Sequence, residues 1–229
     1  MKLERHMMER RSHKLAAFQK LVLLCVFMST IAAGLACGGS EGGIPENTDL
    51  RRGVELQEDG HIEQAYGAYN AAIEADPRNA EAYARRAYVY IVMDDLTSAA
   101  ADLRLAEKLE PDLPLTSLHR GMIYDEIDNH DEAILEYTRA IELEPTLSDA
   151  HISRASVYLE IGDAESALDD LSAAGRLEPE NAELFLVRGQ VYLMTGDLGR
   201  AESDLLQVIE LTDEPGLIST ARQILAALP

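Results

Sequence analysis

The sequence predicts an all-α solenoid in which units of one constant length are stacked on one another. The first observation is a row of arginines spaced 34 residues apart: Arg52, Arg86, Arg120, Arg154 and Arg188. The second is a row of prolines with the same spacing: Pro77, Pro111, Pro145 and Pro179. A period of this length is typical of supersecondary units that cannot bury their apolar faces alone. Such a stack is elongated and offers a long surface suited to binding other proteins.

The first 36 residues have the pattern of an export signal. Basic side chains are frequent at the start, and residues 21–36 then form an uncharged apolar run (LVLLCVFMSTIAAGLA). A basic segment followed by an apolar run and small residues is typical of a secretory signal peptide. The run has 16 residues, whereas a membrane-spanning helix needs about 17 to 25. Residues 1–36 are therefore expected to be a signal peptide rather than a permanent anchor.

The end of this run, residues 33–37 (AGLAC), resembles a bacterial lipobox. In that motif a signal peptidase cuts before the cysteine, and the cysteine thiol carries a diacylglyceryl group. The resemblance implies an exported, membrane-anchored lipoprotein on the extracytoplasmic side, modified at Cys37, with residues 37–46 as lipidated cysteine and flexible linker. Gly34 departs from the motif, which usually has Leu at that place. Ordinary secretion and a retained N-terminal helix are the alternatives.

The chain after residue 36 is strongly acidic. The full chain has 20 Lys+Arg and 41 Asp+Glu; residues 1–36 hold six and two of them, which leaves 14 and 39, a formal charge of −25. Such a surface repels nucleic-acid phosphates, which need clustered Lys and Arg, so no nucleic-acid partner is expected. It also repels anionic lipid headgroups, so the lipid anchor would have to hold the protein at a membrane. With only Cys25 and Cys37 present, no disulfide framework is possible.

More positions repeat when each proline is placed at position 32 of a 34-residue unit. The units are then 46–79, 80–113, 114–147, 148–181 and 182–215. Position 8 is small in every unit, position 20 is always alanine, position 27 is alanine or valine, and positions 11 and 24 are Tyr or Leu. This pattern resembles the tetratricopeptide repeat (TPR). The resemblance implies a right-handed superhelix of five helix-turn-helix units over residues 47–215, each with helices A and B packed antiparallel.

The boundaries within each unit have their own signals. The proline at position 32 ends helix B, and the A–B turn holds residues that favour turns and helix caps. These turns are Asp59-Gly60, Asp94-Asp95, Asp128-Asn129, Gly162-Asp163 and Gly196-Asp197. In the fifth unit the proline comes two residues late, at Pro215. Residues 216–229 then place apolar side chains on one helical face, and we interpret them as a capping helix; a dimerisation helix is the alternative.

The arginine of each unit has a candidate partner sixteen residues later. An acid stands there in four units: Asp102, Glu136, Asp170 and Asp204. Because the arginine is then on helix A and the acid on helix B, the sequence predicts a ladder of ion pairs along the solenoid, with a structural role. Arg52 is the exception, since Ala68 stands at its partner position.

The TPR resemblance implies a binding surface on the concave wall, lined by positions 2, 5, 9 and 12 of helix A. These positions carry no lysine, which disfavours the carboxylate-clamp TPRs that hold acidic chaperone tails. They carry an apolar stripe edged with acids, and about half of the stripe is expected to be core. The stripe is Leu50, Val54, Tyr88, Ile91, Leu118, Met122, Ile152, Leu159, Leu186 and Leu193. Such a groove suits an amphipathic helix or extended peptide with apolar anchors and basic flanks.

The chemistry of an enzyme is missing from the sequence. No Gly-rich phosphate loop, nucleophile elbow or zinc motif appears, so we predict no enzyme, no cofactor other than the lipid, and no metal site. The histidines of the repeats are spread over different units without metal-ligand spacing: His61, His119, His130 and His151. Five acids crowd one A–B turn but lack the ligand order of a calcium loop, and we interpret the turn as solvated: Asp125, Glu126, Asp128, Asp131 and Glu132.

The expected function is therefore a non-enzymatic scaffold. Architecture and signal together favour a lipid-anchored TPR adaptor for cell-envelope protein complexes, whose partners are other exported or membrane proteins. The alternative is a pilotin-like assembly factor for a pilus or secretion-system secretin, because Gly38 after the lipidated cysteine permits outer-membrane sorting. An enzyme or sugar binder within a TPR shell is disfavoured by the missing motifs, although a fold of this kind does not dictate one function.

Overall fold

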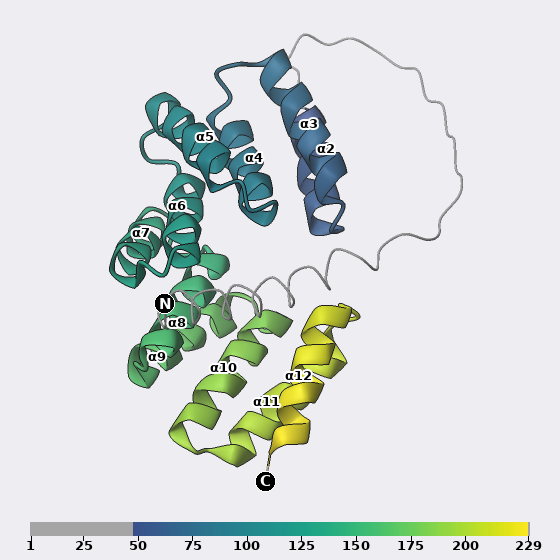
Figure 1. Cartoon of the computed structure of the whole chain (residues 1–229), viewed down its shortest axis with the longest axis vertical. Coiled ribbons are helices and arrows are strands. Elements are labelled where there is room, and N and C mark those ends of the chain that lie inside the picture. The colour runs from purple at the N-terminus through teal and green to yellow at the C-terminus, as the bar shows by residue number, and fades with distance from the viewer. Residues whose placement is uncertain (1–47, 229) are drawn as a thin grey trace, which may run out of the picture.

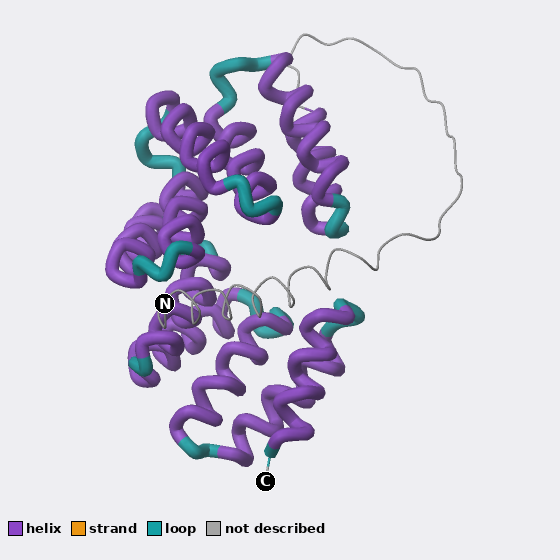
Figure 2. The backbone as a smooth tube through the Cα atoms, viewed as in Figure 1, coloured by secondary structure: helices purple, strands orange, loops and turns teal. Residues whose placement is uncertain are grey.

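The computed structural model describes residues 48–228, and this part of the chain consists of eleven α-helices without a strand (Figures 1 and 2). The all-α fold expected from the repeat period is confirmed. The expected signal peptide, the Cys37 lipidation site and the linker lie outside the described residues. The helices are α2 (Thr48–Glu58), α3 (Ile62–Ala75), α4 (Ala80–Val92), α5 (Leu96–Leu109), α6 (Pro114–Glu126), α7 (His130–Leu143), α8 (Ser148–Ile161), α9 (Ala164–Leu177), α10 (Ala182–Thr195), α11 (Leu198–Leu211) and α12 (Pro215–Ala227).

The helices form five A–B pairs, from α2/α3 to α10/α11, which are stacked along a curved path (Figure 1). From α4 to α10, each A helix contacts the next A helix as well as its own B helix. Within residues 48–228, consecutive B helices make no comparable contact. The A helices therefore lie on the shorter inner radius and line the concave side, while the B helices form the outer wall.

Each A helix is followed, within two residues, by one residue with a left-handed backbone, which is always at position 15 of its unit. The residue is Gly in three units and Asp in two: Gly60 (φ 74), Asp94 (φ 61), Asp128 (φ 57), Gly162 (φ 83) and Gly196 (φ 81). Gly adopts this conformation without steric cost, and Asp tolerates it better than most residues. The next residue caps helix B in three units: the carboxylates of Asp95, Asp163 and Asp197 accept the backbone N–H of the residue three further on.

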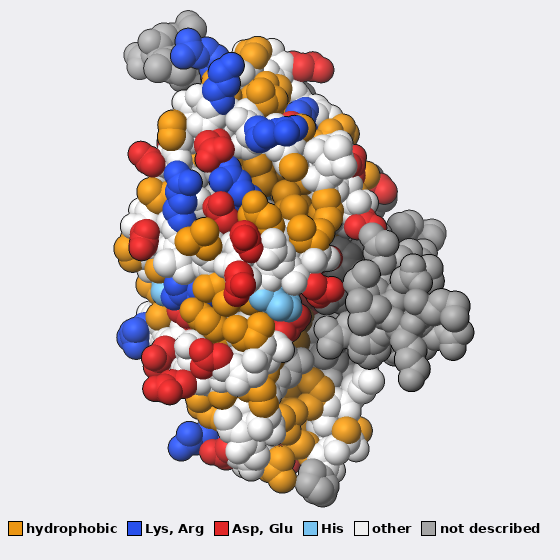
Figure 3. Space-filling view, turned by 60° about the vertical axis from the view of Figure 1, so that its left-hand side comes forward, with side chains coloured by type: hydrophobic (Ala, Val, Ile, Leu, Met, Phe, Trp, Pro, Cys, Tyr) orange, Lys and Arg blue, Asp and Glu red, His pale blue; other side chains and the backbone are white. Residues whose placement is uncertain are grey.

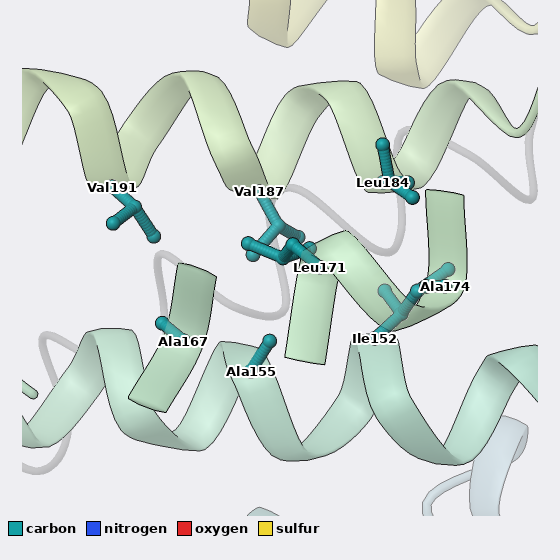
Figure 4. Close-up of a cluster of buried hydrophobic side chains, with 8 residues drawn as sticks. All are labelled: Ile152, Ala155, Ala167, Leu171, Ala174, Leu184, Val187 and Val191. Carbon is teal, nitrogen blue, oxygen red and sulfur yellow. The ribbon is translucent and has the colours of Figure 1, made fainter. Parts of the chain in front are cut away.

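The core is a series of small clusters that join successive pairs. In one of them (Figure 4), Ile152 and Ala155 of α8 and Leu171 of α9 pack against Val187 and Val191 of α10. The cluster thus belongs to two units, which explains why a single unit cannot fold by itself. At the C-terminal end, Leu217, Ile224 and Leu225 of α12 pack on the α10 and α11 side chains of the last cluster. Helix α12 contacts α11 and α10 as a further A helix would, and so lies over the end of the stack.

The side chains at positions 8 and 24 are matched in size in four of the five units; unit five, with Gly189 and Leu205, is the exception. Where position 24 is a buried tyrosine, position 8 is glycine, as in Gly121 with Tyr137; where it is leucine, position 8 is alanine in units two and four. A Cβ built on Gly121 would lie 2.6 Å from two ring carbons of Tyr137. The small residue at position 8 therefore makes room for the large residue on the facing helix.

We expect Gly121→Ala to lower the free energy of unfolding by about 1–3 kcal/mol, because the buried ring of Tyr137 has to move. Adding Tyr137→Leu should recover part of this loss, since it copies the Ala155–Leu171 pairing of unit four. Gly67→Ala is the matched control: Gly67 is exposed in α3, and its added Cβ would meet nothing within 4 Å, so helix propensity should stabilise that variant by about 0.5–1 kcal/mol. Urea unfolding followed by circular dichroism measures all three; equal effects of the two glycine changes would contradict this packing.

The predicted ladder of arginine–carboxylate pairs is confirmed. In units two, four and five the guanidinium donates to both oxygens of the acid at 2.7–2.9 Å: Arg86 to Asp102, Arg154 to Asp170, and Arg188 to Asp204. In unit three the geometry is looser, since Arg120 Nη1 lies 3.2 Å from Glu136 and Nη2 lies 2.9 Å from Glu107. Arg52, which has no acid at position 23, pairs with Asp49 of its own helix at 3.2 Å.

Three of these arginines also reach back to the preceding unit, Arg120 through Glu107 of α5 as described above. Arg86 Nη1 donates to Asn70 Oδ1 on α3 at 2.7 Å, and Arg154 Nη1 donates to Thr138 Oγ1 on α7 at 2.8 Å. Each guanidinium thereby connects three helices: its own A helix, the B helix of its unit and the B helix before it. The ladder is therefore a contact between units as well as within them.

Candidate functional site

The predicted apolar stripe divides into a buried part and a half-buried part. Four of its members are buried in the core clusters: Ile91, Leu118, Ile152 and Leu186. Three of these stand at position 5, and the close approach of consecutive A helices covers that position. These four side chains hold neighbouring units together and are too deeply buried to line a binding groove.

The other six members keep part of their surface in solvent. They are Leu50, Val54, Tyr88, Met122, Leu159 and Leu193. Several rest on a core cluster, as Leu50 and Val54 do on Tyr69, and Met122 does on the cluster around Leu103. These six side chains of the A helices are therefore packed on their inner side and partly exposed on their outer side.

Tyr88 of α4 occupies a central place in this surface. Its ring is 5.5 Å from the His119 ring of α6. Burial raises the pKa of the Tyr88 phenol, and the negative charges of Glu183, Asp149 and Glu214 raise it further. Unit two is thus electrostatically coupled to α8, α10 and the start of α12, because the curved stack brings these distant segments towards the same hollow side.

The three carboxylates form the acidic end of the groove. Asp149 and Glu183 stand at position 2 of α8 and α10, and Glu214 directly precedes α12. Burial raises the pKa of Glu183, and the charges of Asp149 and Glu214 raise it further; burial also raises the pKa of Asp149, with Glu178 adding to the effect. Both side chains are exposed, so it is the surrounding protein surface rather than enclosure in the core that reduces their hydration. A cation placed among these carboxylates would relieve their mutual repulsion.

The outer face has a different character. Acidic, basic and hydrophobic side chains are interspersed on it (Figure 3). Its exposed hydrophobic residues include Leu105 of α5 and Leu135 of α7. Scattered apolar side chains are ordinary on protein surfaces. A residue of the outer face therefore serves as the control when binding to the concave side is tested.

The histidines have separate roles in the structure. His61 is exposed, whereas His151 is buried and its Nδ1 lies 3.0 Å from Asp170 in the ladder. His119 is buried below Tyr88, and its Nδ1 donates to the Ala84 carbonyl at 2.8 Å. His130 lies beside Asp125 and Glu160. The four histidines are thus scattered, as expected, and the neighbour Glu160 of His130 comes from the next unit.

His119 makes stability depend on pH. Burial lowers the pKa of its imidazole to about 4, against about 6.5 in an unfolded chain. The unfolded state therefore takes up a proton first as the pH falls, and the stability present above pH 6.5 is lost between about pH 6.5 and pH 4. Between pH 7.5 and pH 4.5 we expect wild type to lose about 2 kcal/mol more than His119→Asn, which cannot titrate. Parallel pH profiles of urea unfolding in the two proteins would contradict this assignment.

None of the helices within residues 48–228 combines the length and the apolar character required to cross a bilayer.

Comparison with known proteins identifies the repeats. Three stretches match the tetratricopeptide repeat family: residues 68–101, 117–147 and 152–214. The human DnaJ homolog subfamily C member 3 is 33% identical over 87 residues, 36% of this chain, and the match spans 17% of the length of that relative.

Solved structures share the fold at low sequence identity. A thermophilic TPR protein of Thermus thermophilus is 20% identical with a TM-score of 0.68, covering 79% of this chain and 99% of that one. PilW, described as a widely conserved type IV pilus biogenesis factor, is 18% identical with a TM-score of 0.62, covering 81% of this chain and 89% of its own. With its 34-residue units, its paired helices and these matches, the chain contains tetratricopeptide repeats and folds as a TPR superhelix.

Proposed function

We propose that this protein is a non-enzymatic, lipid-anchored adaptor that binds a segment of another envelope protein in its concave groove. The observation that carries the proposal is that an apolar surface and an acidic surface face the same concave side of the superhelix. Tyr88 and Met122 offer half-buried apolar side chains on α4 and α6, and the carboxylates of Asp149, Glu183 and Glu214 are close enough to raise the pKa of Tyr88.

The two ends of the groove differ in chemistry. Position 9 is Tyr88 and Met122 in units two and three, but Ser156 and Gln190 in units four and five, where the acids of position 2 also lie. A matching partner carries a large apolar anchor for the first part and Arg or Lys for the second. Its apolar contacts supply affinity, and the charge pairs fix its direction along the groove.

The membrane anchor rests on the N-terminal sequence. The apolar run ending at Cys37 and the Gly-rich residues 38–46 after it fit a lipidated cysteine on a short linker. Nine such residues span roughly 15–18 Å on average, which keeps the solenoid near the bilayer surface. Labelling cells with an alkyne fatty acid tests the anchor: wild type and Cys25→Ser should be labelled and pellet with membranes, and Cys37→Ser should be neither. Equal labelling of Cys37→Ser would overturn the anchor while leaving the groove proposal intact.

The pilotin-like role is the second candidate. It is favoured by the fold that the chain shares with PilW, a pilus biogenesis factor. The two roles differ in the partner, which is a secretin or pilus component in one case and another envelope complex in the other. The identity of the bound segment therefore separates them.

The binding face is tested by site-specific photo-crosslinking in cells. A photoreactive phenylalanine analogue replaces Tyr88 in the groove or Leu135 on the outer face, where the side chain is 65% exposed. We expect one partner to be crosslinked from position 88 and not from position 135, and mass spectrometry of the product identifies the segment. Crosslinks from position 135 alone would move the binding face to the outer wall.

A further inference from the structure

Three side chains with metal-binding atoms meet where the third unit joins the fourth. Asp125 lies near the end of α6, His130 is the first residue of α7, and Glu160 lies near the end of α8. One ligand atom of each residue lies within 4.8 Å of the other two. His130 Nδ1 is 3.9 Å from Asp125 Oδ1, and His130 Nε2 is 3.9 Å from Glu160 Oε2.

The hydrogen bonding of His130 is incomplete at its Nδ1 atom. It is closed to solvent and forms no hydrogen bond with the described residues. Its 3.9 Å separation from Asp125 Oδ1 is too long for a hydrogen bond. Two ligand atoms of one tetrahedral zinc ion are about 3.4 Å apart, given bonds of 2.0–2.2 Å. A small side-chain movement would therefore let one ion bind both atoms.

The other units show that these residues are exceptions to the repeat. At the position of His130 the other four units have Ile62, Leu96, Ala164 and Leu198. At the position of Asp125 they have Gln57, Ile91, Leu159 and Leu193. Stacking therefore requires neither an imidazole nor a carboxylate at these places. Unit three has His130 where the other units have an apolar residue, and it has Asp125 where they have Gln, Ile or Leu.

Negative charge is concentrated at the same junction. Burial raises the pKa of Tyr137, and the charges of Asp125, Glu126 and Glu160 raise it further. Three carboxylates thus act together on one buried phenol. A cation bound by these side chains would lie within this negative field.

We propose that Asp125, His130 and Glu160 bind one divalent transition-metal ion, with zinc as the best match. The imidazole nitrogen selects against Mg²⁺ and Ca²⁺, which prefer oxygen ligands alone. Two carboxylates and a neutral imidazole neutralise a doubly charged ion, and a water completes the four ligands that zinc prefers. The ion would connect α6 and α7 to α8, and so join the apolar and acidic ends of the concave wall. This inference is independent of the groove's partner.

Zinc titration of the full chain tests the site. The protein is prepared without a histidine tag, stripped with EDTA and titrated with ZnCl₂ by calorimetry, with Co²⁺ absorption as a second readout of the ligand set. We expect wild type to bind one zinc ion per chain. His130→Leu should bind zinc with an affinity at least tenfold weaker. That variant copies Leu96 and Leu198 of other units, so it should fold. His61→Ala removes an exposed imidazole elsewhere and should bind as wild type does.

The melting temperature supplies a readout that does not depend on the titration. Zinc should raise it in wild type and His61→Ala, and leave it unchanged in His130→Leu. Three results would overturn the site: no zinc binding below 100 µM in the wild type, equal affinity in His130→Leu, or equal affinity for Mg²⁺ and zinc.

Discussion

Arg154→Met is expected to lower the free energy of unfolding by about 3 kcal/mol, because it removes the guanidinium from a buried carboxylate and leaves His151 Nδ1, 3.0 Å away, as the remaining side-chain partner of Asp170. Asp170 exposes only 7% of its side chain and accepts two hydrogen bonds from Arg154, at 2.8 and 2.7 Å. The substitution also removes the bond from Arg154 to Thr138, which connects unit four to unit three. Urea unfolding at pH 7.5, followed by circular dichroism, measures the loss.

Arg52→Met is the matched control, since Arg52 occupies the same position in unit one. Its partner Asp49 lies one turn away on the same helix, and the arginine side chain is 59% exposed. An exposed pair of this kind contributes less than about 1 kcal/mol. The double variant Arg154→Met/Asp170→Ala copies Ala68 of unit one and should recover part of the loss, because no unpaired charge is buried. Equal losses in Arg154→Met and Arg52→Met would show that the ladder does not stabilise the stack.

Tyr88→Ser/Met122→Gln is expected to weaken partner binding at least ~30-fold, about 2 kcal/mol, because central apolar anchors carry most of the energy of such interfaces. The substitutions copy position 9 of units four and five, where Ser156 and Gln190 stand in well-formed helices. Folding should therefore be preserved, which a melting curve verifies. A Leu135→Ser variant on the outer wall provides the control and should bind as wild type does.

Features tied to the 34-residue period could be predicted from the sequence. The helix pairs and the arginine ladder follow from residues that recur at fixed positions, because a repeat places equal residues in equal surroundings; the final helix follows instead from the apolar face of residues 216–229. The small residue at position 8 is one such case: Gly121 is required by Tyr137 on the facing helix of the same unit. Contacts within one unit or with its neighbour are therefore readable from the period.

Features that depend on the curvature of the stack could not be predicted in this way. About half of the apolar stripe was expected to be core, but the sequence did not indicate which members; Leu118, Ile152 and Leu186 are buried because the A helices approach one another on the inner radius. The influence of Glu183 on Tyr88 joins residues 95 positions apart, and only the superhelical path brings them near. His130 and Glu160 are 30 residues apart in different units, so no local spacing signalled them; the departure of unit three from the repeat at His130 was the available clue.

The central claim is that the concave wall around Tyr88 binds a segment of another protein. The most direct measurement is calorimetric titration of wild type and Tyr88→Ser/Met122→Gln with a synthetic peptide of the segment crosslinked from position 88. The account predicts affinity at least ~30-fold weaker in the double variant and unchanged in Leu135→Ser. Equal affinity of wild type and the folded double variant would contradict it and move the binding surface away from the groove.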